Sequence, residues 1–356
     1  MRVLLCERSF SGHRKSYFQR LSDMEGIEFY SFAPENTGLP DNRYFAFDSS
    51  KMHKSFADYL SWVRQVRKIV KENRIDVLHL TDGDSVMRYL GIGLHIPDVR
   101  VIVTYHHLFK GAVRRLSYRL MNAGKSHCCV VHTDVLKTEM KKIGVSNVIR
   151  CHYPAFDFDA FEKINSRQCK ARFGLDEGVP VIGIIGGMTE YKHIIPFLNI
   201  LRECTRDFRL LICGSPSELS EQAISEAIAP YRKKVVTVLR KLNDEEYRAA
   251  VAASDIIYCL YGLNFNGASG PLTDGVCCRK LILSCSHGSL GDIVSTYHLG
   301  LTADITNSGA ILRQTESALS QALDFRYDDS AEKYRECIKP EAFAATYKKI
   351  YLGNVE

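Results

Sequence analysis

The chain has 356 residues, 46% of them hydrophobic and 25% charged, which is the composition of an ordinary globular protein with room for two domains. No apolar run approaches the ~20 residues that a membrane-spanning helix needs, and the apolar stretch at 3–6 is shorter than a signal-peptide core of ~7 residues. We therefore expect a cytoplasmic protein. The net charge is +6, with +7 in the first 160 residues and −1 in the rest, and nine basic residues against two acidic ones fall within 100–142. Such a patch indicates an anionic partner.

The first half of the chain alternates short apolar runs with helical patterns. The predicted strands are 3–6, 27–32, 77–80, 101–105, 128–132 and 148–151. Continuous apolar runs rich in Val, Ile and Leu are typical of parallel strands covered on both faces. The segment 59–70 places its apolar residues on one face, as an amphipathic helix does.

The second half repeats this pattern after a break. Its predicted strands are 181–185, 210–213, 235–239, 256–260, 281–285 and 299–303. Alternating strands and helices favour right-handed βαβ units. We therefore predict two Rossmann-like, doubly wound α/β domains, 1–160 and 161–339, with a polar helix over 161–173 after the boundary.

The cysteines and histidines do not predict a metal site. None of the twelve cysteines lies in a CxxC motif, and no His/Cys group has zinc-site spacing. Several cysteines lie inside apolar segments, where Cys acts as a small hydrophobe. We expect no metal and no disulfide framework.

Ligands of open α/β sheets bind at the carboxyl ends of strands, so the loops there are the candidates. The first predicted strand leads to Gly12 and His13, which serve equally well as a simple turn or as a ligand contact. The fourth ends at His106 and His107; a histidine there can hydrogen-bond a substrate or act as acid or base, or it can be a packed or capping residue. The fingerprint GxGxxG does not follow the first predicted strand of either half of the chain, which argues against a dehydrogenase.

The loops of the second half are suited to a phosphate. The strand at 181–185 runs into Gly186 and Gly187, and Lys192 follows where a helix is expected to start. Glycines admit a close ligand, and a lysine beside a helix N-terminus adds a full charge for an anion.

The segment after the strand at 256–260 is the most informative of the chain. Ser269 or Gly270 is the expected N-cap, with Pro271 in the first helical turn. Asp274 can hold a ribose diol or complement the helix dipole. A third loop, 286–289, follows the strand at 281–285 and also precedes a helix. Three loops suited to phosphate in one Rossmann-like domain point to a nucleotide.

The basic stretch at 108–121 interleaves apolar and basic residues. It fits a solvated helix packed on the sheet slightly better than the alternative, an interfacial helix for anionic lipid or a lipid-linked acceptor. No aromatic and basic strand platform accompanies it, so nucleic acid is not expected.

Five segments, in order along the chain, resemble motifs of the retaining glycosyltransferases of the GT-B architecture, and of glycosyltransferase family 4 in particular. They are Ser11-Gly12-His13, the strand ending at His106, Val130–Lys137, Gly186–Lys192 (similar to GRLxxxKG) and the segment from Asp274 to Ile282 (similar to EAMAxGxPV). The final helix, 340–352, is similar to the one that crosses back to the N-terminal domain in that family.

The resemblance implies a hexosyltransferase that moves a sugar from a nucleoside-diphosphate sugar to a glycan or lipid-linked acceptor, as in cell-surface polysaccharide synthesis. It implies a GT-B fold with two domains facing a cleft, and it implies no cofactor and no divalent metal. His106 and Lys192 would be the catalytic pair. The donor would contact the set Gly186, Gly187, Lys192, Asn266, Ser269, Gly270, Pro271 and Asp274, and the acceptor the set Gly12, His13 and His107. The acceptor would attack on the leaving-group face, and a donor phosphate oxygen would take its proton.

The sequence departs from the family pattern at four positions. Gly187 replaces an Arg, Asn266 and Asp274 replace two Glu residues, and Arg279 replaces a Gly. Alternatives of the same fold therefore stay open: a sugar-nucleotide epimerase, a phosphorylase, or a non-catalytic scaffold for a partner enzyme.

Overall fold

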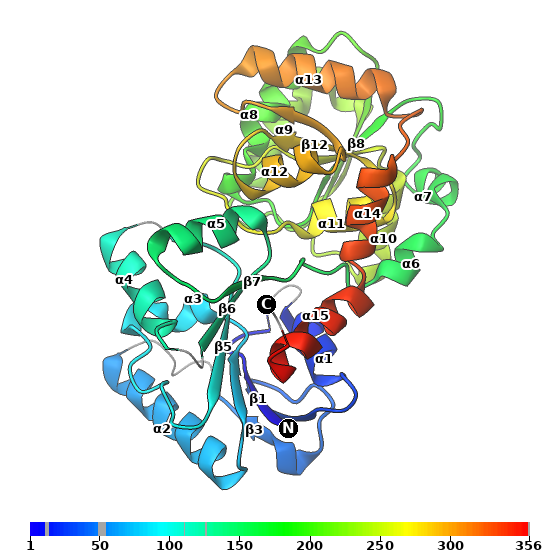
Figure 1. Cartoon of the computed structure of the whole chain (residues 1–356). Helices are drawn as coiled ribbons and strands as arrows, with labels where there is room; N and C mark the ends of the chain where they lie inside the picture. The colour runs from blue at the N-terminus through cyan, green and yellow to red at the C-terminus, as the bar shows by residue number, and fades with distance from the viewer. Residues whose placement is uncertain (11–13, 49–54, 110, 125–126, 355–356) are drawn as a thin grey trace. The chain divides into compact units, whose positions relative to one another are not determined.

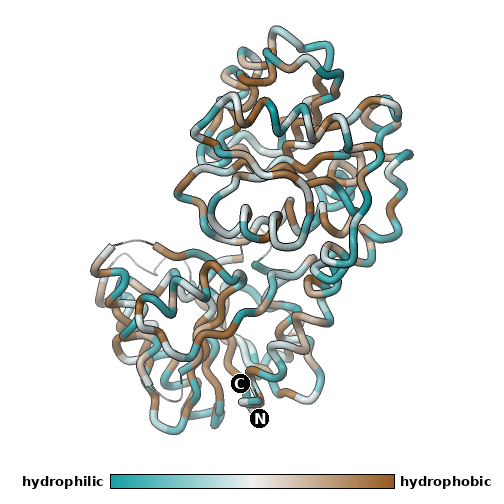
Figure 2. The backbone as a smooth tube through the Cα atoms, turned by 45° about the horizontal axis from the view of Figure 1, so that its top comes forward, coloured by the Kyte–Doolittle hydropathy of each residue, from teal (hydrophilic) through white to brown (hydrophobic). Residues whose placement is uncertain are grey.

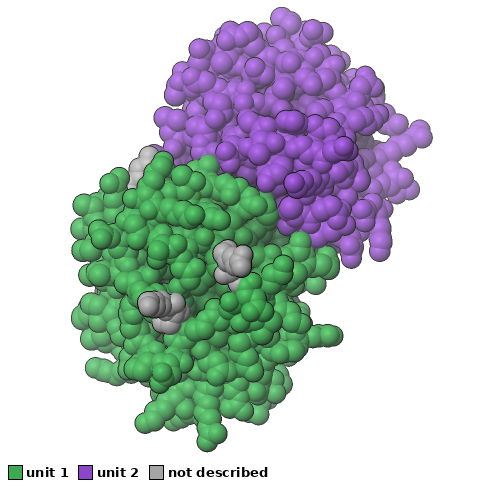
Figure 3. All heavy atoms as spheres, viewed as in Figure 1, with its two compact units in different colours: residues 1–156, 340–356 green, residues 157–339 purple. Residues whose placement is uncertain are grey.

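The computed structural model describes residues 1–10, 14–48, 55–109, 111–124 and 127–354. The chain forms two compact units (Figure 3). Unit 1 comprises residues 1–156 and 340–356, and unit 2 comprises residues 157–339. The change of unit lies at 156/157, four residues before the position chosen from sequence.

Unit 1 is built on a seven-stranded parallel sheet of order β3-β2-β1-β4-β5-β6-β7. Its strands are β1 (Arg2–Cys6), β2 (Glu28–Ala33), β3 (Tyr44–Ala46), β4 (Val77–Leu80), β5 (Arg100–Tyr105), β6 (His127–Val131) and β7 (Val148–Arg150). Six of these match the predicted strands. The sequence reading missed β3, a three-residue edge strand whose side chains are only partly buried.

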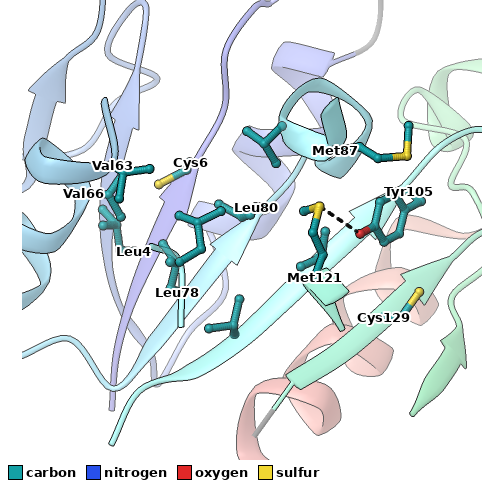
Figure 4. Close-up of a cluster of buried hydrophobic side chains, with 14 of the residues drawn as sticks. Leu4, Cys6, Val63, Val66, Leu78, Leu80, Met87, Tyr105, Met121 and Cys129 are labelled. Carbon is teal, nitrogen blue, oxygen red and sulfur yellow. Dashed lines mark hydrogen bonds between the residues drawn. The ribbon is translucent and has the colours of Figure 1, made fainter. Parts of the chain in front are cut away.

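Helices cover both faces of this sheet (Figure 1). They are α1 (Arg14–Ser22), α2 (Phe56–Glu72), α3 (Gly83–Val86), α4 (Ala112–Met121), α5 (Asp134–Ile143) and α15 (Pro340–Leu352). One core cluster joins the sheet to α2, α3, α4 and α5, and Figure 4 shows part of it, with the Tyr105 hydroxyl donating to the Met121 sulfur at 3.7 Å. The opposite cluster joins the sheet to α1 and α15.

The C-terminal helix α15 completes unit 1, as the predicted fold requires. The Tyr347 hydroxyl hydrogen-bonds the Tyr17 hydroxyl of α1 at 2.5 Å and the Thr104 hydroxyl of β5 at 2.8 Å. His79 of β4 contacts the Tyr351 hydroxyl at 2.7 Å. All of these groups are buried, so the network stabilises one position of α15 against the sheet.

Unit 2 has a six-stranded parallel sheet of order β10-β9-β8-β11-β12-β13. Its strands are β8 (Val181–Ile185), β9 (Arg209–Cys213), β10 (Val235–Val238), β11 (Ile256–Cys259), β12 (Leu281–Cys285) and β13 (Gly300–Ala303). Its helices are α6 (Phe158–Glu162), α7 (Ser166–Arg172), α8 (Ile194–Ile200), α9 (Glu221–Ile228), α10 (Asp244–Ala253), α11 (Gly270–Cys277), α12 (Gly288–Thr296), α13 (Ser308–Gln321) and α14 (Asp329–Cys337). The strands of both units are hydrophobic along most of their length (Figure 2).

One predicted element is wrong. The sequence reading expected a single helix over 161–173, and the structure has α6 and α7 with a break between them. Asn165 causes the break, because its side chain accepts the Gln168 N–H and so caps a new helix.

Candidate functional site

Lys192 lies in a short 3-10 turn, Glu190–Lys192, after β8, and its side chain is turned inward. It is only 6% exposed, and its ammonium donates to the Ile185 carbonyl at 2.9 Å. No carboxylate of the described residues forms an ion pair with it, and burial lowers its pKa to about 8. A buried cation without an anionic partner is costly, which suggests that an anion completes the site.

The loop beside Lys192 depends on glycine. Gly186 has φ +92°, and a Cβ there would lie 3.3 Å from the Lys192 ammonium. A Cβ on Gly214 would lie 2.0 Å from the Gly186 carbonyl oxygen, so the two loops touch through backbone. Gly187 is exposed, and a Cβ there would meet only the Ser217 hydroxyl, at 3.7 Å. This loop therefore presents bare backbone next to a buried charge.

The N-terminus of α11 lies near the same lysine. Ser269 is the N-cap, and its hydroxyl accepts the Leu272 N–H and contacts the Tyr261 hydroxyl at 3.1 Å. The Lys192 ammonium lies 5.8 Å from the centre of the Tyr261 ring. Pro271 has no N–H and Thr273 donates to the Ser269 carbonyl, so Gly270 supplies the first-turn N–H that is left for a ligand.

Asp274 and Asn266 lie farther along this segment. Asp274 is buried in α11, where it accepts the Tyr247 hydroxyl of α10 at 2.7 Å. Asn266 is partly exposed, and its carbonyl accepts the Ser289 hydroxyl at 2.8 Å. Thus the predicted donor residues Gly186, Lys192, Ser269 and Gly270 gather at one edge of the unit 2 sheet, and Asp274 is turned toward α10.

His106 follows β5 in unit 1. Its Nε2 donates to the Thr81 carbonyl at 2.9 Å, which fixes the tautomer because a carbonyl can only accept. Burial, assisted by the charge of Arg14, lowers the pKa of His106 to about 3. His106 is therefore neutral at physiological pH, and its Nδ1 is a hydrogen-bond acceptor rather than a proton donor.

Carboxylates around His106 form a group that the sequence reading missed. Asp84 accepts the backbone N–H of His106 at 3.0 Å and that of His107 at 3.1 Å, and burial next to Asp82 raises its pKa to about 8. Arg14 forms ion pairs with Asp82 and Glu7. Glu7 follows β1 and Asp82 follows β4, so the rule that predicted His106 would also have found them.

Two predicted acceptor residues, Gly12 and His13, lie outside the described residues. His107 is partly exposed, and burial lowers its pKa. No group of three or more His, Cys, Asp or Glu side chains in the described part of the chain is arranged to hold a metal ion. All twelve cysteines are free.

The predicted basic helix is α4. Its Tyr118 and Met121 are buried against the sheet, while Val113, Leu116 and Leu120 are exposed by 70%, 48% and 40%. Among the described helices, none is long and apolar enough to cross a membrane. The helix therefore packs on the sheet, as expected of a solvated surface helix, and it also presents an apolar outer face, as expected of an interfacial helix.

Comparisons with known proteins concern the sequence and the fold. Residues 18–160 match the model of Glycosyltransferase Family 4. No curated protein matches the chain. Solved structures resemble it over almost its whole length.

Three of these structures illustrate the likeness. A glycosyltransferase from Rickettsia africae ESF-5 has a TM-score of 0.75 at 15% identity, over 98% of this chain and 97% of that one. Sucrose-phosphate synthase from Thermosynechococcus elongatus has a TM-score of 0.74 at 14% identity, over 99% and 98%. Anabaena HepE in complex with UDP has a TM-score of 0.76 at 12% identity, over 99% and 100%. The chain therefore has the GT-B fold, and residues 18–160 of its N-terminal unit are similar to the Glycosyltransferase Family 4 model.

Proposed function

We propose that this protein is a retaining hexosyltransferase that moves a sugar from a nucleoside-diphosphate sugar to a hydroxyl of a glycan or lipid-linked acceptor. The observation that carries the proposal is Lys192, a buried ammonium beside bare glycine backbone that has no carboxylate partner among the described residues. A diphosphate leaving group supplies the missing anion. Its departure is the step that a fixed cation accelerates, because negative charge develops there in the transition state.

The other groups of unit 2 support a diphosphate in the same place. The Gly270 N–H and the positive end of α11 add a second point of attraction for phosphate. The structure of Anabaena HepE was also determined with UDP-glucose, and we assign a donor of that chemical class to this chain. With Lys192 and a helix terminus to neutralise the leaving group, the proposed reaction uses no divalent metal.

Unit 1 would contribute His106 to the donor sugar. Because Nε2 is bound to the Thr81 carbonyl, Nδ1 would accept a hydrogen bond from a sugar hydroxyl. In a retaining reaction the acceptor hydroxyl attacks from the face that the diphosphate leaves, and a donor phosphate oxygen takes its proton. With a pKa of about 3, His106 is too weak a base to compete for that proton.

The outer face of α4 supports a peripheral membrane association. Val113, Leu116 and Leu120 are exposed among Arg115 and Arg119, the combination that inserts shallowly into an anionic interface. Co-sedimentation with phosphatidylglycerol vesicles tests this, with Leu116→Ser expected to weaken binding and phosphatidylcholine vesicles as the control. The association would be contradicted if the wild type and Leu116→Ser sedimented to the same extent with phosphatidylglycerol and with phosphatidylcholine vesicles.

The first experiment is a thermal-shift panel with UDP, GDP, ADP, CMP, TDP and NAD. A ligand at about 100 times its Kd stabilises a protein by about 2.7 kcal/mol, so the correct nucleotide should stand out. Lys192→Ala should abolish that shift, whereas Lys170→Ala changes another buried lysine, one already paired with Asp255 at 2.7 Å, and should retain it. A shift with NAD alone, or with no nucleotide, would contradict the proposal.

Transfer itself is then measured with the sugar nucleotide whose base gave the shift. Release of the nucleoside diphosphate only in the presence of an acceptor extract supports a transferase. A changed free sugar nucleotide would indicate an epimerase, and dependence on inorganic phosphate a phosphorylase. NMR of the product's anomeric proton tests retention.

A further inference from the structure

Unit 1 has a second recess, at the amino-terminal ends of its strands. A cavity of about 700 Å³ lies between the C-terminal half of α2 and the loop 96–99 that precedes β5. Its floor is aliphatic, and its rim carries five cations and two carboxylates. These are Arg64, Arg67, Lys68, Lys71, Arg74, Asp76 and Asp98. The six residues of β5, at ~3.3 Å each, separate this recess from His106 by about 20 Å.

The cations form a stripe along α2, which lies on the outside of unit 1 (Figure 1). Arg64, Arg67, Lys68 and Lys71 follow the spacing i, i+3, i+4, i+7, so they share one face of the helix. Like charges at these spacings oppose helix formation. Only Glu72 relieves the repulsion within the helix, through an ion pair with Lys68 at 3.9 Å.

Most of this charge is not used within the protein. Arg67 has a structural role, because it donates to the carbonyls of Gly93 and His95 at 3.0 and 3.4 Å and so holds the loop that forms the opposite wall. In the described chain, Arg64, Lys71 and Arg74 form no ion pair within 4.0 Å. Asp76 is already engaged, since it accepts the Arg2 backbone N–H at 2.7 Å.

Arg74 adds an independent observation. It is exposed and has φ +51°, a left-handed conformation that glycine adopts freely and other residues adopt at a cost. The position continues the basic stripe just beyond the end of α2. Arg74 thus occupies the left-handed position that ends α2, where glycine is the common residue, and it adds a further positive charge to the groove.

We propose that this basic groove binds a phosphate-bearing anion with at least two phosphate groups, at a site separate from the donor site. Arg64, Lys71 and Arg74 would supply the free charge, and the aliphatic floor would accept a less polar part of the ligand. The phosphates belong either to a soluble metabolite or to a lipid headgroup. The groove faces away from the carboxyl ends of the strands, so the ligand regulates or localises the protein and takes no part in the chemistry. The proposal does not rest on the proposed function.

The test uses the full chain and two probes: inorganic tripolyphosphate in calorimetry, and vesicles containing cardiolipin, a lipid whose headgroup carries two phosphates, in co-sedimentation. The groove variants are Arg74→Gly, which removes a charge and relieves backbone strain, and Arg64→Gln with Lys71→Gln. The matched control is Lys141→Gln with Lys142→Gln, two exposed lysines of α5. A urea melt of Arg74→Gly is expected to show no loss of stability.

Tripolyphosphate is expected to bind the wild type. Its Kd should rise about tenfold or more in the variant with Arg64→Gln and Lys71→Gln, and should stay within twofold of the wild-type Kd in the control variant. The thermal shift with the donor nucleotide should stay the same in every variant. Binding to vesicles alone, lost in the groove variants, assigns the phosphates to a lipid headgroup. Equal weakening in control and groove variants, or binding of neither probe, would overturn the proposal.

Discussion

The buried ammonium of Lys192 makes a quantitative prediction about stability and pH. Burial lowers its pKa from 10.5 to about 8, so between these values the unfolded chain holds a proton that the folded chain has released. Stability therefore rises with pH across this window. With ~1.36 kcal/mol per pKa unit, burial of Lys192 costs about 3 kcal/mol at pH 7, where the lysine is charged in both states, and about 1 kcal/mol at pH 10, where the folded lysine is neutral. Lys192 alone should thus raise the free energy of unfolding by about 2 kcal/mol from pH 7 to pH 10.

Urea unfolding of wild type and Lys192→Met at half-unit pH steps measures this rise. Met also leaves the Ile185 carbonyl without its hydrogen bond, which shifts the mutant curve by a constant amount. The difference between the two curves cancels that offset and the titration of all other groups. Curves that run parallel from pH 7 to pH 10 would refute the buried, unpaired ammonium.

The same reasoning extends to the ligand. A bound diphosphate keeps Lys192 protonated, so each pH unit above 8 should raise the Kd of the nucleotide up to tenfold. A pH-independent Kd between 8 and 9.5 would show that the nucleotide does not contact this ammonium.

Three further predictions concern Gly187 in the donor loop, Asp84 beside His106 and Tyr347 of α15. Gly187→Arg has room for its side chain and adds the cation that the resembled family carries there, so nucleotide affinity should rise about tenfold, and an unchanged Kd would contradict it. The pKa of Asp84 is raised from 3.8 to about 8, so the folded state holds a proton and loses stability as the pH rises from about 4 to 8. Asp84→Asn keeps an acceptor for both backbone N–H groups and should make the Tm fall less steeply over this range. If the slope of Tm against pH is the same in the variant, Asp84 is not the source of the fall. Tyr347→Phe removes the hydroxyl that lies 2.5 Å from the buried Tyr17 hydroxyl, so the free energy of unfolding measured in urea should fall by about 1–3 kcal/mol. A fall of less than ~0.5 kcal/mol would show that other contacts hold α15 on the sheet.

The sequence predicted the fold well because both sheets are parallel and buried. Their strands are continuous apolar runs, and the turn residues between them are unambiguous. The failures are local: β3 buries too little of its three residues to show a pattern, and the cap at Asn165 divides a helix that composition alone predicts as one.

The site was predictable where one loop contains both the flexible backbone and the charge, as in Gly186 to Lys192. It was not predictable where the partners come from separate loops, as in the contact between Tyr247 and Asp274 or the pairing of Arg14 with Asp82. The basic groove was missed for another reason. The density of basic residues is highest over 100–142, whereas the cations of α2 are spread over a longer segment and gather only when the helix places them on one face.

The position of α15 has a consequence for synthesis of the protein. One face of the unit 1 sheet needs Phe343, Tyr347, Ile350 and Tyr351 to be covered, yet these residues follow unit 2 in the chain. A ribosome working at ~5–20 residues/s reaches them about 10–40 s after residue 156. During that time the nascent first unit exposes a strip of aromatic and aliphatic surface, while unit 2 has everything it needs to fold. Unit 2 is translated after residues 1–156, yet it is the first unit whose whole sequence is available to fold, and this strip of unit 1 stays uncovered until α15 is translated.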